Sequence, residues 1–279
     1  MSSAVTTDDG LADAQAFAQS VAGVVRRAGP GDGSACWAPG AVPHAGACAL
    51  TAALDELGWP SVATDPDLIA CAGLGGVELG RALAPLALVD GLLGASPLSG
   101  ELIRCRVDGE RAIGSGLILR AIGSAEPVPS ADGLDVHRVT GLGDPLPLDP
   151  EAWRIAFAAW LAAGVGYLAG VGEGALDLTV TYVRQRRAFD TTLAALAPVQ
   201  QLLARAATEI RGVRLLAATA PGADALAHAG PAVADACAAC QQVTGAIGFT
   251  LEYPLQRYTQ RARALATWND ALLDALTPG

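Results

Sequence analysis

Three arginines stand at the end of a long apolar stretch and are well suited to hold an anion. In "VRQRRAFD" they are Arg184, Arg186 and Arg187, and Phe189 follows. A guanidinium is planar, and its fork of N–H donors matches the oxygens of a phosphate. Cations at a helix C-terminus also interact favourably with the helix dipole, which gives a purely structural reason for the same residues. Both interpretations are open from these residues alone.

The other residues with chemical potential give weaker signals. Cys237 and Cys240 form a CxxC inside an Ala-rich helical run, with no second pair and no histidine at ligand spacing. We therefore expect buried thiols there, and neither a zinc site nor a redox site. His44, His137 and His228 lie far apart with no recognisable partner, so we expect no metal site.

Composition excludes several classes of partner. The chain has 279 residues, 28 acidic against 18 basic, and a net charge of -10. It has no overall positive field to hold nucleic acid or an anionic membrane surface. The first residues lack the regions of a secretory signal, and we find no uninterrupted apolar span of about 20 residues. We expect a cytoplasmic protein that contacts neither nucleic acid nor membrane.

The chain divides into three parts. Residues 1–98 show helical periodicity, residues 99–149 show short alternating runs around the turn signal Asp108-Gly109, and residues 150–279 return to helix. Pro145, Pro147 and Pro150 mark the second boundary. The glycines of "GLGGVELG" (residues 73–80) do not fit the spacing of a dinucleotide-binding loop, and the stretch continues as helix.

The last part resembles a known family. "GVGEGALDLTVTYVRQRRAFD", "APVQQLLA" and "CQQVTGAIGFTLEYPLQRYTQRARA" are similar in order and spacing to the C-terminal helical domain of acyl-CoA dehydrogenases. The matching residues are Tyr182, Arg186, Phe189, Gln242, Gly245, Gly248, Phe249, Glu252, Tyr253 and Pro254. The resemblance implies a mainly α fold with an N-terminal helical domain, a shortened middle β segment and a C-terminal four-helix-type domain.

The resemblance also implies an FAD cofactor. In the family, the arginine at the position of Arg186 reaches the pyrophosphate of a neighbouring subunit's FAD, and the following phenylalanine packs on the cofactor. Arg184 and Arg187 are then expected only to face water. The cofactor-binding residues implied for this chain are Arg186, Phe189, Gln242, Val243, Thr244, Gly245 and Ala246.

Several positions depart from the family pattern. Ala197 replaces a glutamine, Ala246 replaces the second glycine of a Gly-Gly pair, and Asp190 replaces the glycine after the phenylalanine. We expect each substitution to weaken flavin binding. The fifty residues of the middle segment also stand in for a much larger barrel, and are too few to house a complete flavin site.

Both family positions for the catalytic base lack a carboxylate. One falls on Asn269 and the other on Trp160, and neither side chain accepts a proton near neutral pH. Asp270 is a weak substitute that requires a one-residue shift, and Glu173 lies two turns or more from the second position. We expect Asp270 to be a polar tail residue and Glu173 to lie on a solvated helix face, so we assign no catalytic residue.

Three interpretations remain. The chain resembles the base-lacking subunit of actinobacterial α2β2 heterotetramers that oxidise acyl-CoA thioesters of sterol side chains or steroid fragments, in which it completes a partner's FAD site. Alternatively it is a complete, divergent homo-oligomeric dehydrogenase. The third interpretation is a non-redox protein that binds an acyl thioester or another protein.

Overall fold

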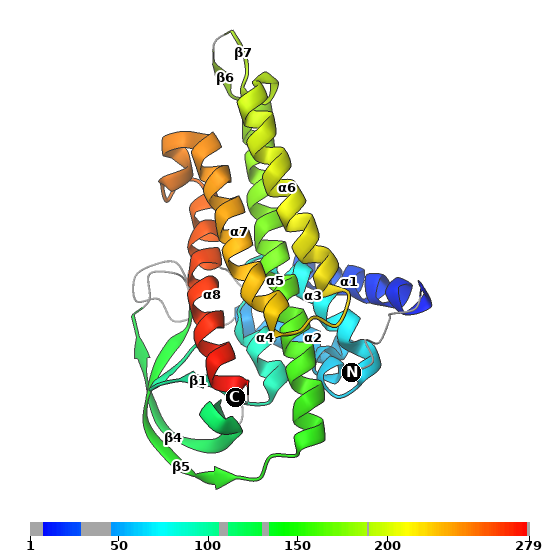
Figure 1. Ribbon diagram of the computed structural model, residues 1–279, viewed down its shortest axis with the longest axis vertical. Helices are drawn as coiled ribbons and strands as arrows, with labels where there is room; N and C mark the ends of the chain where they lie inside the picture. Colours follow the sequence, from blue (N-terminus) through cyan, green and yellow to red (C-terminus); the bar gives the residue numbers. More distant parts are fainter. Residues whose placement is uncertain (1–7, 29–45, 106–110, 130–133, 189, 278–279) are drawn as a thin grey trace.

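The computed structural model describes residues 8–28, 46–105, 111–129, 134–188 and 190–277. Along the chain, helices come first, then a small barrel, then four long helices (Figure 1). This is the predicted fold class, mainly α with a short β segment before a C-terminal helical domain. One buried hydrophobic cluster includes residues of all three parts, so the parts share a core.

The described residues of the N-terminal part form α-helices and short 3-10 turns. The α-helices are α1 (Asp8–Ala28), α2 (Gly46–Leu57), α3 (Ile69–Arg81) and the short α4 (Ala87–Asp90). The 3-10 turns are η2 (Trp59–Ala63), η3 (Pro66–Leu68) and η4 (Gly91–Leu93). The buried Trp59 donates its ring N–H to the carbonyl of Leu88 at 2.8 Å, which fixes the turn against the segment that carries α4.

The middle part is a closed barrel of five strands. The strands are β1 (Ser96–Ser99), β2 (Leu102–Ile103), β3 (Arg111–Gly114), β4 (Ile118–Val128) and β5 (Val136–Leu146). Their order is β1-β2-β5-β4-β3, and β1 closes the barrel by pairing parallel to β3. The 3-10 turn η5 (Ser115–Leu117) connects β3 to β4. The predicted turn at Asp108-Gly109 lies outside the described residues.

The C-terminal part is built around one helix of 36 residues, α5 (Pro150–Gln185). Asp149 caps it by accepting hydrogen bonds from the backbone N–H groups of Glu151 and Ala152, and Pro150 occupies the first turn, where its missing N–H costs nothing. The elements that follow are β6 (Arg187–Ala188), β7 (Thr191–Thr192), η6 (Leu193–Ala195), α6 (Ala197–Ala217), α7 (Ala223–Thr244), η7 (Gly245–Phe249) and α8 (Leu255–Leu276). The helices end near the predicted breaks at Asp190, "APGAD" and "TGAIGF".

Helices α3 and α5 approach so closely that only glycine fits between them. A Cβ atom on Gly76 would lie 2.4 Å from the carbonyl oxygen of Ala163, and one on Gly170 would lie 2.0 Å from that of Val77. The glycines of "GLGGVELG" therefore serve helix packing, and the stretch is helical, as predicted. This contact joins the first helical part to the last.

Helix α5 is long and apolar enough to cross a membrane, which corrects the sequence-based expectation that no such stretch exists. Its most apolar 18-residue stretch has a mean hydropathy of 1.7. Inside the protein, 72% of that stretch is buried. A core helix has the same length and composition, so the apolar character of α5 is explained by packing.

Candidate functional site

Asn269 and Trp160, which the family resemblance assigns to the two base positions, line one small cavity. Asn269 comes from α8 and Trp160 from α5, and both side chains are buried. The cavity has a volume of about 10 Å³, which is room for one water molecule at most. Its other lining residues are Leu86, Val89, Arg104, Gly164, Tyr167, Leu226 and Leu265.

A buried ion pair lies beside this cavity. Arg104, directly after β2, donates to Asp90 at the end of α4 from Nε at 3.0 Å and from Nη2 at 2.5 Å. The third arm of the guanidinium, Nη1, donates to Oδ1 of Asn269 at 2.6 Å. The ring N–H of Trp160 donates to Oδ1 of Asp90 at 3.0 Å. Exposed fractions are 0% for Asp90 and 2% for Arg104, so the network is closed to solvent.

The network leaves no group free to remove a proton. Asp90 is its one carboxylate and already accepts three hydrogen bonds, two from Arg104 and one from Trp160. Burial alone would lower the pKa of Arg104, but the adjacent Asp90 carboxylate raises it above the ordinary value, so the guanidinium stays charged. Burial raises the pKa of the neighbouring Cys105 thiol well above its ordinary value, which keeps that thiol neutral.

A second buried arginine lies on the same side of α5. Arg261 donates from Nη1 to the hydroxyl of Tyr167 at 2.5 Å, and that hydroxyl donates to the carbonyl of Ala84 at 2.7 Å. Burial raises the pKa of Tyr167, so its hydroxyl remains protonated and acts as a donor. These bonds join α8, α5 and the loop after α3.

Arg186 lies at the far end of the helical bundle, exposed to solvent. It follows the last residue of α5, and its backbone N–H bonds to the carbonyl of Tyr182. Arg184 and Arg187 are exposed as well, but Arg187 donates to the carbonyl of Asp190 at 2.8 Å, so it does more than face water. Phe189 lies outside the described residues.

Asp190, one of the departures from the family pattern, has a backbone conformation that glycine favours. Asp190 adopts a left-handed conformation with φ of 60°, which is the conformation that favours the glycine of the family pattern. Aspartate is one of the residues that tolerate this region. The chain therefore reverses between β6 and β7 without the glycine.

The turn after α7 lies at the same end of the bundle as Arg186. The rings of Tyr182 and Tyr253 are 5.9 Å apart, and the Tyr253 hydroxyl donates to the carbonyl of Leu178 on α5 at 2.9 Å. These contacts place the predicted turn residues near the end of α5, where Figure 1 also shows β6 and β7. Two segments about 60 residues apart thus converge as the motif register predicts.

The predicted turn residues differ in accessibility. Gln242 and Ala246 are exposed, and Val243 and Gly245 are half-buried. Gly245 has φ of 69°, and a Cβ atom on it would meet nothing within 4 Å, so its backbone faces open space. The Thr244 hydroxyl is buried and bonds to the carbonyls of Cys240 and Gln241. Gln241, which sequence reasoning missed, holds the turn by donating to the carbonyl of Gly248 at 3.1 Å.

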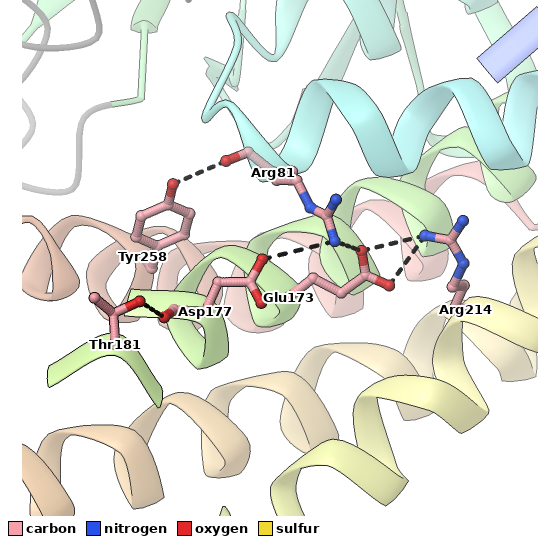
Figure 2. A network of polar contacts seen from close by, with 6 residues as sticks. All are labelled: Arg81, Glu173, Asp177, Thr181, Arg214 and Tyr258. Atoms are coloured by element: carbon pink, nitrogen blue, oxygen red, sulfur yellow. Dashed lines mark hydrogen bonds and ion pairs between the residues drawn. The ribbon is translucent and has the colours of Figure 1, made fainter. Parts of the chain in front are cut away.

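Neither alternative carboxylate reaches the cavity. Asp270 is exposed on α8, whereas Asn269 beside it is buried. The expectation that Glu173 lies on a solvated helix face is wrong, because its side chain is only 16% exposed and pairs with two arginines. Figure 2 shows both arginines reaching it, Arg81 at 2.5 Å and Arg214 at 3.0 Å. Glu173 thus connects α3 and α6 to α5.

The cysteines and histidines form no reactive cluster in the described part of the chain. Cys237 and Cys240 are buried free thiols, and burial raises the pKa of both. His137 is mostly buried, with Nδ1 at 3.4 Å from a carboxylate oxygen of Asp135, and His44 lies outside the described residues. No group of three or more His, Cys, Asp and Glu side chains in the described ranges could hold a metal ion.

Asp90 and Arg104 were not found from the sequence. Asp90 is a single charge inside the apolar run "LALVDGLL", whereas Arg104 lies in "ELIRCRVD", close to Glu101 and Arg106. A charge in such a run is a signal for a buried pair, since charged residues are almost never fully buried unless paired. The sequence does not show which residue pairs with such a charge.

Comparison with known proteins gives one family match, in the C-terminal part of the chain. Residues 161–269 match the family model described as acyl-CoA dehydrogenase, C-terminal domain. A search of curated protein sequences gave no match. The matched range begins one residue after Trp160 and ends at Asn269.

Solved structures extend the likeness to nearly the whole chain. The ChsE4-ChsE5 complex from Mycobacterium tuberculosis is 15% identical, with a TM-score of 0.71 over 96% of this chain and 95% of that chain. A variant of the Tcur3481-Tcur3483 steroid ACAD is 18% identical, with a TM-score of 0.68 over 94% and 95%. Glutaryl-CoA dehydrogenase from Mycobacterium smegmatis is 16% identical, with a TM-score of 0.67 over 92% and 91%. The chain has the acyl-CoA dehydrogenase fold.

Proposed function

We propose that this chain is a subunit of a flavin-dependent acyl-CoA dehydrogenase, in which it completes a partner's FAD site and does not supply the catalytic base. The reaction of the complex is the α,β-desaturation of an acyl-CoA thioester. The observation that carries the proposal is a contrast within the chain. The two base positions, Asn269 and Trp160, are sealed by an ion pair, whereas Arg186 is exposed.

The exposed end of the bundle has the charge that a phosphate requires. Arg186 and Arg187 are both exposed at this end, although the whole chain has a net charge of -10. A local excess of arginines attracts an anion that the rest of the protein repels. The open backbone at Gly245 provides room for close approach of a ligand. These residues fit the pyrophosphate of FAD, which when bound supplies the hydride acceptor of the reaction.

The same end of the bundle offers an apolar surface to a partner. Phe249 and Leu251 are 64% and 74% exposed, and Ile247 is 39% exposed. Large apolar side chains that gather on an exposed turn are typical of a protein interface. The hydrogen bond from Gln241 to Gly248 holds the turn in place before any partner binds. The proposed partner is an acyl-CoA dehydrogenase-like subunit with an intact base, in an α2β2 assembly.

Two of the similar structures support an unlike partner. One is named as the ChsE4-ChsE5 complex and the other as the Tcur3481-Tcur3483 steroid ACAD, and each name joins two different chains. The second name also includes a steroid, which supports a sterol side chain or a steroid fragment as the acyl group. The proposal includes a cytoplasmic location, which the buried free cysteines in the described part of the chain favour.

The FAD content of the co-purified complex tests the role of Arg186. We expect Arg186→Ala to lower the flavin-to-protein ratio, because the substitution removes a charged donor set from the cofactor. Arg184→Ala is the matched control, since Arg184 is also exposed at this end of the bundle and should leave the ratio unchanged. Equal flavin content in both variants would remove Arg186 from the FAD site.

A further inference from the structure

We infer that the Asp90–Arg104 pair is a permanent lock that closes this chain's own acyl-binding position and fastens the barrel to the helices. The inference deepens the proposed function and rests on the same fold assignment. It does not depend on the partner, because every residue involved belongs to this chain.

The lock joins four elements from all three parts of the chain. Asp90 ends α4, Arg104 follows strand β2, Trp160 lies in α5 and Asn269 lies in α8. Each hydrogen bond of the network crosses from one of these elements to another. Movement of the barrel away from the helices would therefore break bonds at Arg104.

The bonding of the pair makes opening costly. Every arm of the Arg104 guanidinium has an acceptor, with Nε and Nη2 on Asp90 and Nη1 on Asn269. Separating the two charges inside the protein leaves each without compensation, which is far more costly than breaking an exposed pair. An acyl group that entered here would have to displace one of these partners.

The cavity beside the Asp90–Arg104 pair is too small for anything larger than a water molecule. The cavity keeps an apolar wall of Leu86, Val89, Leu226 and Leu265, which would suit an acyl chain. Its volume of about 10 Å³ holds no acyl group. The centre of the Arg104 guanidinium lies 5.9 Å from the centre of the Trp160 ring, so these two side chains occupy the space between the walls.

Thermal unfolding of single variants tests the lock. We expect Asp90→Asn and Arg104→Met each to lower Tm by on the order of 10 °C, since each leaves a buried partner unpaired. The matched controls are Glu151→Gln and Arg154→Met, which break an exposed pair and should shift Tm by about 2 °C or less. Shifts at Asp90 and Arg104 no larger than those of the controls would overturn the inference.

A milder variant covers the case in which these proteins do not fold. Trp160→Phe removes the N–H that reaches Asp90 together with part of the indole, and keeps a six-membered aromatic ring. Its hydrogen–deuterium exchange should rise in β2, next to Arg104, while exchange in α6 stays unchanged. A uniform change over the whole chain, or no change in the barrel, contradicts an interdomain lock.

Acyl binding to the isolated chain tests closure. We expect octanoyl-CoA and free CoA to change Tm equally, because the acyl group finds no entry. A larger shift with octanoyl-CoA that Trp160→Phe alters would overturn closure. Neither result depends on flavin. These experiments can therefore contradict the closure by Asp90 and Arg104 without contradicting the shared FAD site, and the flavin measurement can contradict the FAD site without contradicting the closure.

Discussion

Arg104 and Asn269 are 165 residues apart in the sequence, yet Nη1 of Arg104 lies 2.6 Å from Oδ1 of Asn269. Asn269 is the residue that the family resemblance assigns to the position of a catalytic glutamate. Here its side chain accepts a hydrogen bond from a buried arginine that is already paired with Asp90. Asn269 is therefore part of the interior of the protein.

Asn269→Ala should destabilise the protein by about 1–3 kcal/mol, because it leaves one arm of the buried Arg104 without an acceptor. Asp270→Ala is the adjacent control, and since Asp270 is exposed, its effect should stay within about 0.5 kcal/mol. Urea denaturation of the two variants and the wild type measures both changes. Similar values for the two variants would show that the bond between Arg104 and Asn269 adds little.

Gly76→Ala should destabilise the protein by roughly 1–3 kcal/mol or more, because the added Cβ would lie 2.4 Å from the carbonyl oxygen of Ala163 and would push α3 from α5. Gly212→Ala provides the opposite control. A Cβ at Gly212 meets nothing within 4 Å, and alanine favours the helix by about 0.5–1 kcal/mol. Chemical denaturation should therefore give opposite signs for the two, and equal signs would argue against close helix packing.

Glu173→Gln should cost about 1–2 kcal/mol, because Glu173 is mostly buried and pairs with Arg81 and Arg214 (Figure 2). The cost should shrink at high salt, which screens the exposed sides of the arginines. Asp177→Asn is the control: Asp177 is 72% exposed and lies 3.8 Å from Arg81, so its replacement should change stability by less than about 0.5 kcal/mol. Unfolding of both variants at low and high salt measures these changes. Equal effects of the two substitutions would show that Glu173 stabilises the protein no more than Asp177 does.

Glu78→Gln should stabilise the protein relative to the wild type as the pH rises from 4 to 7. Burial raises the pKa of Glu78, although nearby arginines oppose the shift. The folded state thus favours the protonated carboxyl, and its contribution to stability is present below about pH 4.5 and is lost as the pH rises through the raised pKa. Glutamine stays neutral throughout this range.

Denaturation of the wild type and the Glu78→Gln variant at pH 4 and pH 7 checks this sign. Glu56→Gln, on the exposed side of α2, serves as the control and should track the wild type at both values. A stability difference between wild type and Glu78→Gln that does not grow between pH 4 and pH 7 would contradict the assigned direction.

Local patterns account for what the sequence could predict. Prolines and glycines indicate the helix ends near Pro150 and Asp190, and the family resemblance assigns Asn269 and Trp160 to two alternative base positions. In the structure these two side chains line the same cavity. These features depend on neighbours along the chain or on a resemblance. They need no knowledge of long-range packing.

The rest depends on contacts between distant segments. The closure by Asp90 and Arg104 joins residues from different elements, and nothing near either residue identifies its partner. Glu173 was expected on a solvated face because its two arginine partners come from other helices, 92 and 41 residues away. The positions of charged pairs inside a shared core follow from packing, which periodicity alone does not determine.

The visible absorption spectrum of the purified protein tests the central claim most directly. It should be recorded for the chain alone and for the complex after co-expression with an acyl-CoA dehydrogenase-like partner that has an intact base. We predict flavin bands in the complex and none in the chain alone, since the chain offers Arg186 to a shared site and its cavity beside Asn269 is too small for a flavin. Flavin bands in the chain alone would indicate a complete homo-oligomeric dehydrogenase, and no flavin in either sample would favour a non-redox protein; both results contradict the proposed function.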